Sequence, residues 1–215
     1  MKTKLVQLGL VITAALTLGR TTTAQSVNIS GGRLVADHYL LGSSMRGVGG
    51  AMTFRTPVPR LDVQLSLSRY AGTSSRVGVV CAGLVEPGTC GSEAIHDEST
   101  LYLFSVGPSI NIVRAQGFTF DVIGQVQGGG VNSDTYGLKT GRSLTANKTL
   151  WGVSGGVAAG WQPNLRKPIV FQGSVTAGRL GGIRDNTLVD GYSPYEGKAF
   201  STHQLSIGVA YLLFR

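Results

Sequence analysis

The chain is short of charge and of basic runs, and each shortage excludes a class of protein. Only 14% of its 215 residues are charged, whereas a soluble domain averages about 25%. A disordered chain needs high charge and low hydrophobicity, so a 42% hydrophobic content argues against disorder. No run of lysine and arginine occurs, which argues against a nucleic-acid partner. The 32 glycines follow no Gly-X-Y period, so a collagen-like chain is excluded as well.

Long apolar runs are also lacking, apart from one at the N-terminus. Lys2 and Lys4 precede the apolar segment 5–19, and Ala24 then offers a small residue for cleavage. This order predicts a secretory signal over residues 1–24. An anchoring helix is disfavoured, because the run is about 15 residues long and a spanning helix needs about 20. Cleavage would remove three positive charges and lower the net charge from +8 to +5.

Cysteine is nearly absent, since Cys81 and Cys90 are the chain's two cysteines. In an exported chain, a closely spaced pair predicts a disulfide, with two free buried thiols as the alternative. Cys81 lies far from the expected cleavage site, which argues against a lipid anchor there.

From residue 25 onward, apolar residues alternate with small or polar ones. The clearest case is 102–112, where apolar residues repeat with a period of two. This period places alternate side chains on opposite faces of a strand. The segment 48–54 is rich in glycine and 27–35 shows the weakest pattern. Seven segments besides 102–112 are predicted strands: 27–35, 48–54, 62–68, 118–127, 151–161, 169–177 and 204–211.

Short and long links alternate between these predicted strands. The short, turn-forming links are 58–60, 114–117 and 162–168. The long polar links are at about 39–45, 76–98, 133–148 and 184–200. Such alternation is typical of an antiparallel meander with long loops at one end and tight turns at the other. We therefore predict an all-β, eight-stranded antiparallel up-and-down barrel over residues 25–215.

The two faces of the predicted strands suit different surroundings. One face is nearly pure in Phe, Val, Leu, Ile, Tyr and Trp. An unpaired buried polar group costs about 1–3 kcal/mol, so the other face cannot form a dry core. A charge facing lipid at the midplane would cost roughly 2–4 kcal/mol. We therefore predict the apolar face outward and these residues in a polar lumen: Arg55, Asp62, Gln64, Asp121, Gln125 and Gln172.

Two states of the lumen follow from this assignment. The polar side chains can form an occluding hydrogen-bonded plug, because the interior of an eight-stranded barrel is just wide enough for side chains to fill. Alternatively, glycines on the inward face leave gaps and a narrow water-filled passage. The glycines concerned are Gly49, Gly124, Gly152, Gly156 and Gly208.

Aromatic residues gather near both ends of the predicted strands. One group lies near the tight turns or the C-terminus: Phe54, Phe118, Trp161, Phe171 and Phe214. The other lies near the long links: Tyr70, Tyr102, Phe104 and Trp151. Two girdles of this kind flank the apolar band of a membrane barrel. The general preference of aromatics for strands does not explain their clustering at strand ends.

With its export signal, its alternating links and its terminal strand 203–215, the chain resembles the small eight-stranded bacterial outer-membrane barrels of the OmpA/OmpX type. The resemblance covers residues 26–215. It implies an outer-membrane monomer surrounded by lipid, with four long external loops and three short periplasmic turns. It also implies a structural, surface-interaction or minor permeability role, with a loop-binding partner that the sequence does not identify. In the family the last strand ends on an aromatic residue that the barrel assembly machinery recognises, whereas here Arg215 follows Phe214.

One motif is shared with hydrolases. Residues 152–156 match the G-x-S-x-G elbow around Ser154, and Asp190 and His203 follow in the order of α/β-hydrolases. The motif needs a strand, a sharp turn and a helix, whereas Ser154 lies within a continuous predicted strand. We therefore expect no catalytic residue, and we interpret Ser154 as a small residue facing the lumen.

Metal ions and cofactors are not expected either. His38, His96 and His203 share no ligand spacing. The adjacent Asp97 and Glu98 are interpreted as a solvated pair rather than a calcium site. No phosphate loop, dinucleotide fingerprint or zinc motif is present.

Two other functions remain as alternatives. A soluble exported carrier of the lipocalin type would need an apolar lumen, an early Gly-X-Trp motif and a late helix. Neither Trp151 nor Trp161 lies near the start, and no late helix is predicted. A lipid-modifying barrel enzyme is the weaker alternative, because lipid A deacylases pair a histidine with a serine two residues later and Leu205 holds that position after His203.

Overall fold

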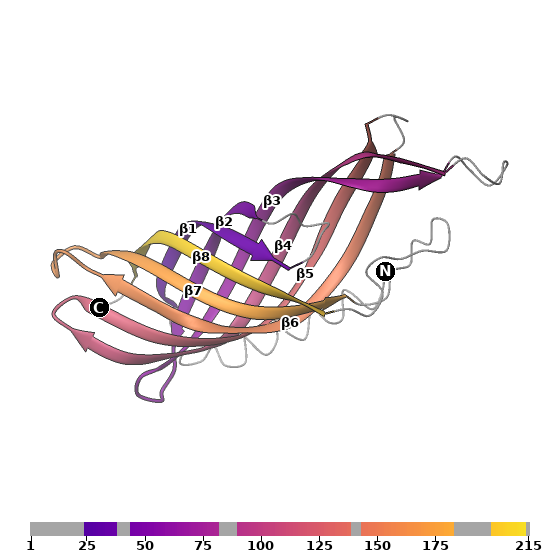
Figure 1. The fold of residues 1–215 in the computed structure, drawn as a ribbon. Coiled ribbons are helices and arrows are strands. Elements are labelled where there is room, and N and C mark those ends of the chain that lie inside the picture. The colour runs from indigo at the N-terminus through magenta and orange to yellow at the C-terminus, as the bar shows by residue number, and fades with distance from the viewer. Residues whose placement is uncertain (1–23, 38–43, 82–89, 139–142, 183–198, 214–215) are drawn as a thin grey trace.

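The computed structural model describes residues 24–37, 44–81, 90–138, 143–182 and 199–213. Their strands form one closed antiparallel barrel, in which each strand pairs with the next and β8 pairs with β1 (Figure 1). The strands are β1 (Ala24–Ala36), β2 (Met45–Arg55), β3 (Leu61–Cys81), β4 (Cys90–Ala115), β5 (Phe118–Gly137), β6 (Ser143–Trp161), β7 (Ile169–Gly182) and β8 (Ala199–Leu212). The predicted eight-stranded up-and-down barrel is confirmed.

Among the described residues, no helix is long and apolar enough to cross a membrane.

The three predicted tight turns lie together at one end of the barrel, which we call the turn end. They link β2 to β3, β4 to β5 and β6 to β7, and the opposite end is called the loop end. The β4–β5 turn consists of Gln116 and Gly117, with φ angles of 46° and 84°. Two left-handed residues are what a two-residue type I′ hairpin requires. A Cβ on Gly117 would also lie 2.6 Å from the carbonyl oxygen of Gln162, so glycine is needed there on both counts.

The stretches 76–98 and 133–148, predicted as long loops, are largely strand. β3 and β4 stay paired out to Cys81 and Cys90, and β5 and β6 stay paired within the second stretch. These strands therefore run beyond the loop-end limits of β1, β2, β7 and β8 (Figure 1). The prediction was wrong because several inward positions of this stretch hold polar side chains, such as Asp97, Ser99 and Ser133, so these strands show no apolar alternation. We call this part of the wall the β3–β6 extension: residues 72–81, 90–100, 132–137 and 143–149.

The apolar face of the strands points outward, as predicted. Ile29, Val48, Leu67, Val153 and Ile207 are between 60% and 74% exposed. At the turn end, Trp161 stacks on Phe118 and packs against Phe171, each with ring centroids 6.2 Å apart. A soluble monomer rarely exposes contiguous apolar surface of this extent. The outer wall is therefore built to meet an apolar surrounding.

Candidate functional site

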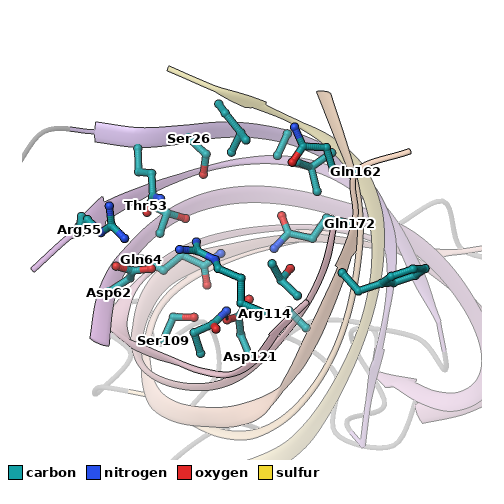
Figure 2. Close-up of a pocket in the computed structure, with 18 of the residues that line it drawn as sticks. Ser26, Thr53, Arg55, Asp62, Gln64, Ser109, Arg114, Asp121, Gln162 and Gln172 are labelled. Carbon is teal, nitrogen blue, oxygen red and sulfur yellow. Dashed lines mark hydrogen bonds between the residues drawn. The ribbon is translucent and has the colours of Figure 1, made fainter. Parts of the chain in front are cut away.

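The barrel interior is polar at the turn end, where it holds a chamber of about 450 Å³ (Figure 2). The figure shows Gln64, Arg114 and Gln172 directed into the barrel. Asn111 Nδ2 donates a hydrogen bond to Asp121 Oδ1 over 2.7 Å. Two arginines and two aspartates, Arg55, Arg114, Asp62 and Asp121, balance the charge of the chamber. Five of the six predicted lumen residues line it: Arg55, Asp62, Gln64, Asp121 and Gln172. Arg114 was expected in a turn, and Gln125 lines the next cavity.

Amide side chains narrow the interior on the loop-end side of this chamber, where a cavity of about 70 Å³ remains. Gln125 Nε2 donates to Gln64 Oε1 over 3.1 Å. Asn28 Nδ2 donates to Gln172 Oε1 over 2.5 Å. Each bond joins two strands that flank a third, so it passes over the inner face of β4 or β8. These bonds are of the kind that the predicted plug requires, and they narrow this part of the barrel.

Further toward the loop end, several buried polar atoms have no hydrogen-bond partner among the described residues. They belong to Gln127, Ser154, Thr202 and Gln204. Gln127 and Thr202 are each 1% exposed. An unsatisfied buried polar atom costs about 1–3 kcal/mol, so this layer is suited to hold water molecules. The four residues carry amides and hydroxyls, so they provide no acid–base pair for catalysis.

The hydrolase-like triad is not assembled. Ser154 lies in the middle of the continuous strand β6, and its Oγ has no hydrogen-bond partner among the described residues. His203 is exposed on β8 and thus points away from the lumen. Asp190 and His38 lie outside the described residues. The interpretation of Ser154 as a lumen-facing residue is consistent with its 8% exposure.

An apolar layer closes the interior near the loop end. Every strand contributes at least one buried apolar side chain to it, and none of these is more than 7% exposed. We call this layer the apolar disc: Leu34, Ala36, Met45, Tyr70, Leu101, Leu103, Val131, Leu150, Leu180 and Phe200.

The disc corrects two predictions. The lumen is polar only in its turn-end part, because the inward positions of the strands become apolar toward the loop end. Tyr70, predicted in the outer aromatic girdle, is 4% exposed inside the disc. It has the same strand parity as Asp62 and Gln64, whereas the outward Leu67 has the opposite parity. Proximity to a strand end was therefore a weaker guide than the period of two.

The glycines at 152 and 156 leave no gaps in the wall, contrary to one predicted alternative. A Cβ on Gly152 would overlap the carbonyl oxygen of Arg179, and one on Gly156 would overlap that of Val175. Neighbouring backbone already fills the space, because closing a sheet of eight strands forces strong curvature. The structure therefore favours an occluded lumen at these positions.

A buried carboxylate in the β3–β6 extension was missed by the sequence analysis. Asp97 is fully buried, and its carboxylate accepts hydrogen bonds from Thr135 Oγ1 over 2.6 Å and Ser74 Oγ over 3.4 Å. Glu98 is exposed and lies 3.7 Å from His96 Nε2. The predicted solvated pair was thus wrong for Asp97, since adjacent strand residues face opposite sides. Among the described residues, no group of three His, Cys, Asp or Glu residues could hold a metal ion.

The two cysteines lie at the tip of the β3–β4 hairpin. Cys81 ends β3, Cys90 begins β4, and the register places them directly opposite each other. The disulfide between them stays a prediction.

The geometry defines the class of protein as a closed eight-stranded up-and-down barrel with an apolar outer wall. No protein-family model and no curated protein matches the chain. A major outer membrane protein of Thermus thermophilus superposes with a TM-score of 0.56 at 14% identity, covering 88% of this chain and 99% of that one. Neisserial surface protein A (NspA) superposes with a TM-score of 0.52 at 11% identity, covering 90% and 100%.

These two likenesses establish the fold. The chain has the fold of small outer-membrane β-barrels, so the resemblance inferred from the sequence is confirmed at this level.

Proposed function

We propose that the chain is an integral β-barrel of a bacterial outer membrane with a structural or surface-interaction role. The observation that carries this proposal is the outward apolar wall of a closed barrel. Lipid accepts only structures whose backbone groups are paired internally, and a closed barrel meets that condition. In this orientation the turn end faces the periplasm, and the loop end with the β3–β6 extension faces outward.

The same proposal covers export and assembly. A signal over residues 1–24 would direct the chain out of the cytoplasm. Its cleavage after Ala24 would leave the rest of β1 intact, because β1 begins at that residue. Strand β8 would then present the C-terminal segment to the barrel assembly machinery. Any specific partner would be bound by the external part of the molecule.

A soluble carrier of an apolar ligand is the less favoured function. Its ligand would need an apolar lumen, whereas the chamber at the turn end contains Asp62, Asp121 and several amides. The apolar disc is closed by its own side chains.

We propose further that the barrel is not an enzyme. This rests on Ser154, whose hydroxyl lies within a strand and has no histidine beside it among the described residues. Ser154→Ala should leave lipid hydrolysis by purified protein at the background level of the wild type. A lipid-hydrolysing activity that disappears in Ser154→Ala would contradict this.

Membrane fractionation tests the main proposal. The protein should be recovered with the detergent-extracted outer membrane, and it should migrate differently on gels before and after boiling. Recovery as a soluble periplasmic protein without detergent would contradict the proposal and favour the carrier.

A further inference from the structure

Cationic side chains form a row on the outer surface of the barrel. Arg33 on β1, Arg46 on β2, Arg69 on β3, Arg179 on β7 and His203 on β8 are all exposed. Next to four of them in the chain stand inward residues of the apolar disc, namely Leu34, Met45, Tyr70 and Leu180. The row therefore runs along the outside of the disc over five of the eight strands. We call these five residues the cationic belt.

The register shows that the belt is continuous. Arg33 pairs directly with Arg46, and Arg46 pairs with Ala71, which places Arg69 at the diagonal position. Direct and diagonal cross-strand neighbours lie within reach of long side chains. The three arginines therefore form one cluster across β1, β2 and β3.

The belt continues in the other direction around the barrel. His203 pairs with Val35, which makes Arg33 its diagonal neighbour. His203 also pairs with Ala177, which makes Arg179 diagonal on the other side. The belt thus crosses five adjacent strands.

Aromatic residues flank the belt on both sides. Arg69 pairs directly with Tyr102, and its guanidinium carbon lies 5.8 Å from the tyrosine ring centroid. Trp151 pairs with Gly181 and is thus diagonal to Arg179. Tyrosine and tryptophan mark the interface between membrane and water, so the belt lies at the level of lipid headgroups.

The residues below the belt fix its level further. Two residues toward the turn end from Arg46 and Arg69 stand Val48 and Leu67, which are 67% and 61% exposed. Leu205 holds the same position relative to His203 and is 51% exposed. The belt is therefore the first charged row above the lipid-facing band.

In the described part of the chain, cations outnumber carboxylates around the belt. The exposed Asp37 donates its backbone N–H to Ser201 O, which places it diagonal to His203. Among the described residues, no ion pair joins a belt residue to a carboxylate.

Glu98 and Asp134 line a hollow together with Arg46, but they lie farther toward the loop end. The Glu98 carboxylate lies 3.7 Å from His96 Nε2, and the Asp134 carboxylate accepts a hydrogen bond from Thr145 Oγ1.

The direct pairing of Arg33 with Arg46 is unfavourable on its own. Like charges directly opposite each other destabilise a sheet. The Nε of Arg33 donates a hydrogen bond to Ser44 Oγ, which supplies no negative charge. An anion between the two guanidiniums would remove the repulsion, and phosphate oxygens suit the planar guanidinium geometry.

We propose that the cationic belt binds the phosphate groups of a phosphorylated glycolipid in the outer leaflet. This inference rests on the proposed outer-membrane location, which sets the loop end in that leaflet. A row over five strands fits several phosphates carried by neighbouring lipids, and the apolar wall below it contacts their acyl chains.

The test compares lipid affinity in variants with two cations removed. The chain is refolded in zwitterionic detergent micelles, and its affinity for bisphosphorylated lipid A is measured by native mass spectrometry. R33Q/R46Q should weaken binding by about thirtyfold, because each arginine near a lipid surface contributes roughly a fivefold factor. The matched control R166Q/K167Q removes two exposed cations at the turn end and should change the affinity by less than about twofold. Dephosphorylated lipid A should bind the wild type at least as weakly as intact lipid A binds R33Q/R46Q, because it offers no phosphate to any belt residue.

The outcomes separate this inference from the proposed function. Unchanged lipid A affinity in R33Q/R46Q, in samples that retain the heat-dependent shift in gel mobility, would overturn the belt alone. Equal binding of the dephosphorylated lipid, or of phosphatidylglycerol, would overturn the choice of a phosphorylated glycolipid. A wild-type chain without the gel shift would overturn the barrel function on which the inference rests.

Discussion

Near the loop end of the barrel, adjacent residues of a strand place one side chain on the outer surface and the next in the interior. Arg69 is exposed on the outer surface, while Tyr70 is buried in the apolar disc. Arg179 and Leu180 divide in the same way on β7. A shift of one residue in register would put a cation in the interior and an apolar side chain in the headgroup region. The identity of each such pair therefore helps to fix the register of its strand.

The first residue-scale prediction tests the two faces of β5. Val122 is 41% exposed on the outer wall, whereas Gln125 is bonded to Gln64 inside the barrel. Val122→Arg should cost roughly 2–4 kcal/mol in lipid. Gln125→Arg should cost about 1 kcal/mol, the usual net value of a lost hydrogen bond. Urea unfolding in phospholipid vesicles measures both.

Phe120→Arg is a milder form of the same test, because Phe120 lies closer to the interface and the penalty falls toward about 0–1 kcal/mol there. Equal tolerance of arginine at Val122 and Gln125 would mean that the face assignment is wrong.

The second residue-scale prediction compares two glycines of β6. A Cβ on Gly152 would overlap backbone, whereas one on Gly155 would meet the carbonyl oxygen of Ile123 at 3.6 Å, an ordinary contact. Gly152→Ala should destabilise the barrel by about 1–3 kcal/mol, as overpacking does. Gly155→Ala should stay within about 0.5 kcal/mol of the wild type. If both variants unfold at the wild-type urea concentration, the close approach at Gly152 is not limiting.

At the scale of elements, the strands divide into the closed barrel and the β3–β6 extension that runs beyond it. β1 and β2 have 13 and 11 residues, whereas β3 and β4 have 21 and 26. A spanning strand needs about 9–11 residues. The long strands therefore exceed the length of a spanning strand, and their surplus forms the β3–β6 extension, within which Asp97 is fully buried.

The element-scale prediction concerns the tip of this sheet. Cys81 and Cys90 face each other across the β3–β4 ladder, a pairing in which Cα separations of about 4.5–5.5 Å suit a disulfide. The bond should stabilise the tip by roughly 2–3 kcal/mol in the chain-entropy model. Cys81→Ser should leave the barrel assembled, with its gel shift intact, while the extension becomes more sensitive to protease.

Cys90→Ser serves as the matched control, because loss of either thiol should produce the same cleavage pattern. Mass spectrometry that finds both thiols free in the exported protein would contradict the disulfide.

At the scale of the whole molecule, the interior is a polar chamber closed by an apolar layer. The chamber opens toward the turn end, hydrogen-bonded amides narrow the interior above it, and the disc fills the section near the loop end. The side chains of the disc are at most 7% exposed, so we expect them to block water and ions. The barrel should therefore conduct little.

The whole-molecule prediction is that conductance depends on the disc. Wild-type protein in planar bilayers should show small or no channels. The variant Tyr70→Ala/Leu180→Ala, which removes two large side chains of the disc, should show discrete openings. The control Leu67→Ala/Leu205→Ala truncates two outward residues and should remain closed. Large, stable channels in the wild type would contradict the prediction. So would a Tyr70→Ala/Leu180→Ala variant that has a normal gel shift but shows no openings.

Much of the architecture was predictable from the sequence because it depends on local periodicity. The alternation in 102–112, the short links and the outward position of residues such as Val122 are local properties of a strand in contact with lipid. The polar residues Asp62, Gln64, Asp121 and Gln172 were placed in the lumen by the same rule, and the structure brings them around one chamber.

The tertiary structure decided what depends on position around and along the barrel. Strand pairing continues into 76–98 and 133–148 because the backbone groups of each strand there form hydrogen bonds with a neighbouring strand. No apolar pattern in the sequence indicates this pairing. The apolar disc and the cationic belt each gather residues from five or more strands at one level, and that level is set by the register of closure. A single strand's sequence carries the direction of each side chain but not its height relative to the other strands, so these layers exist only in the closed barrel.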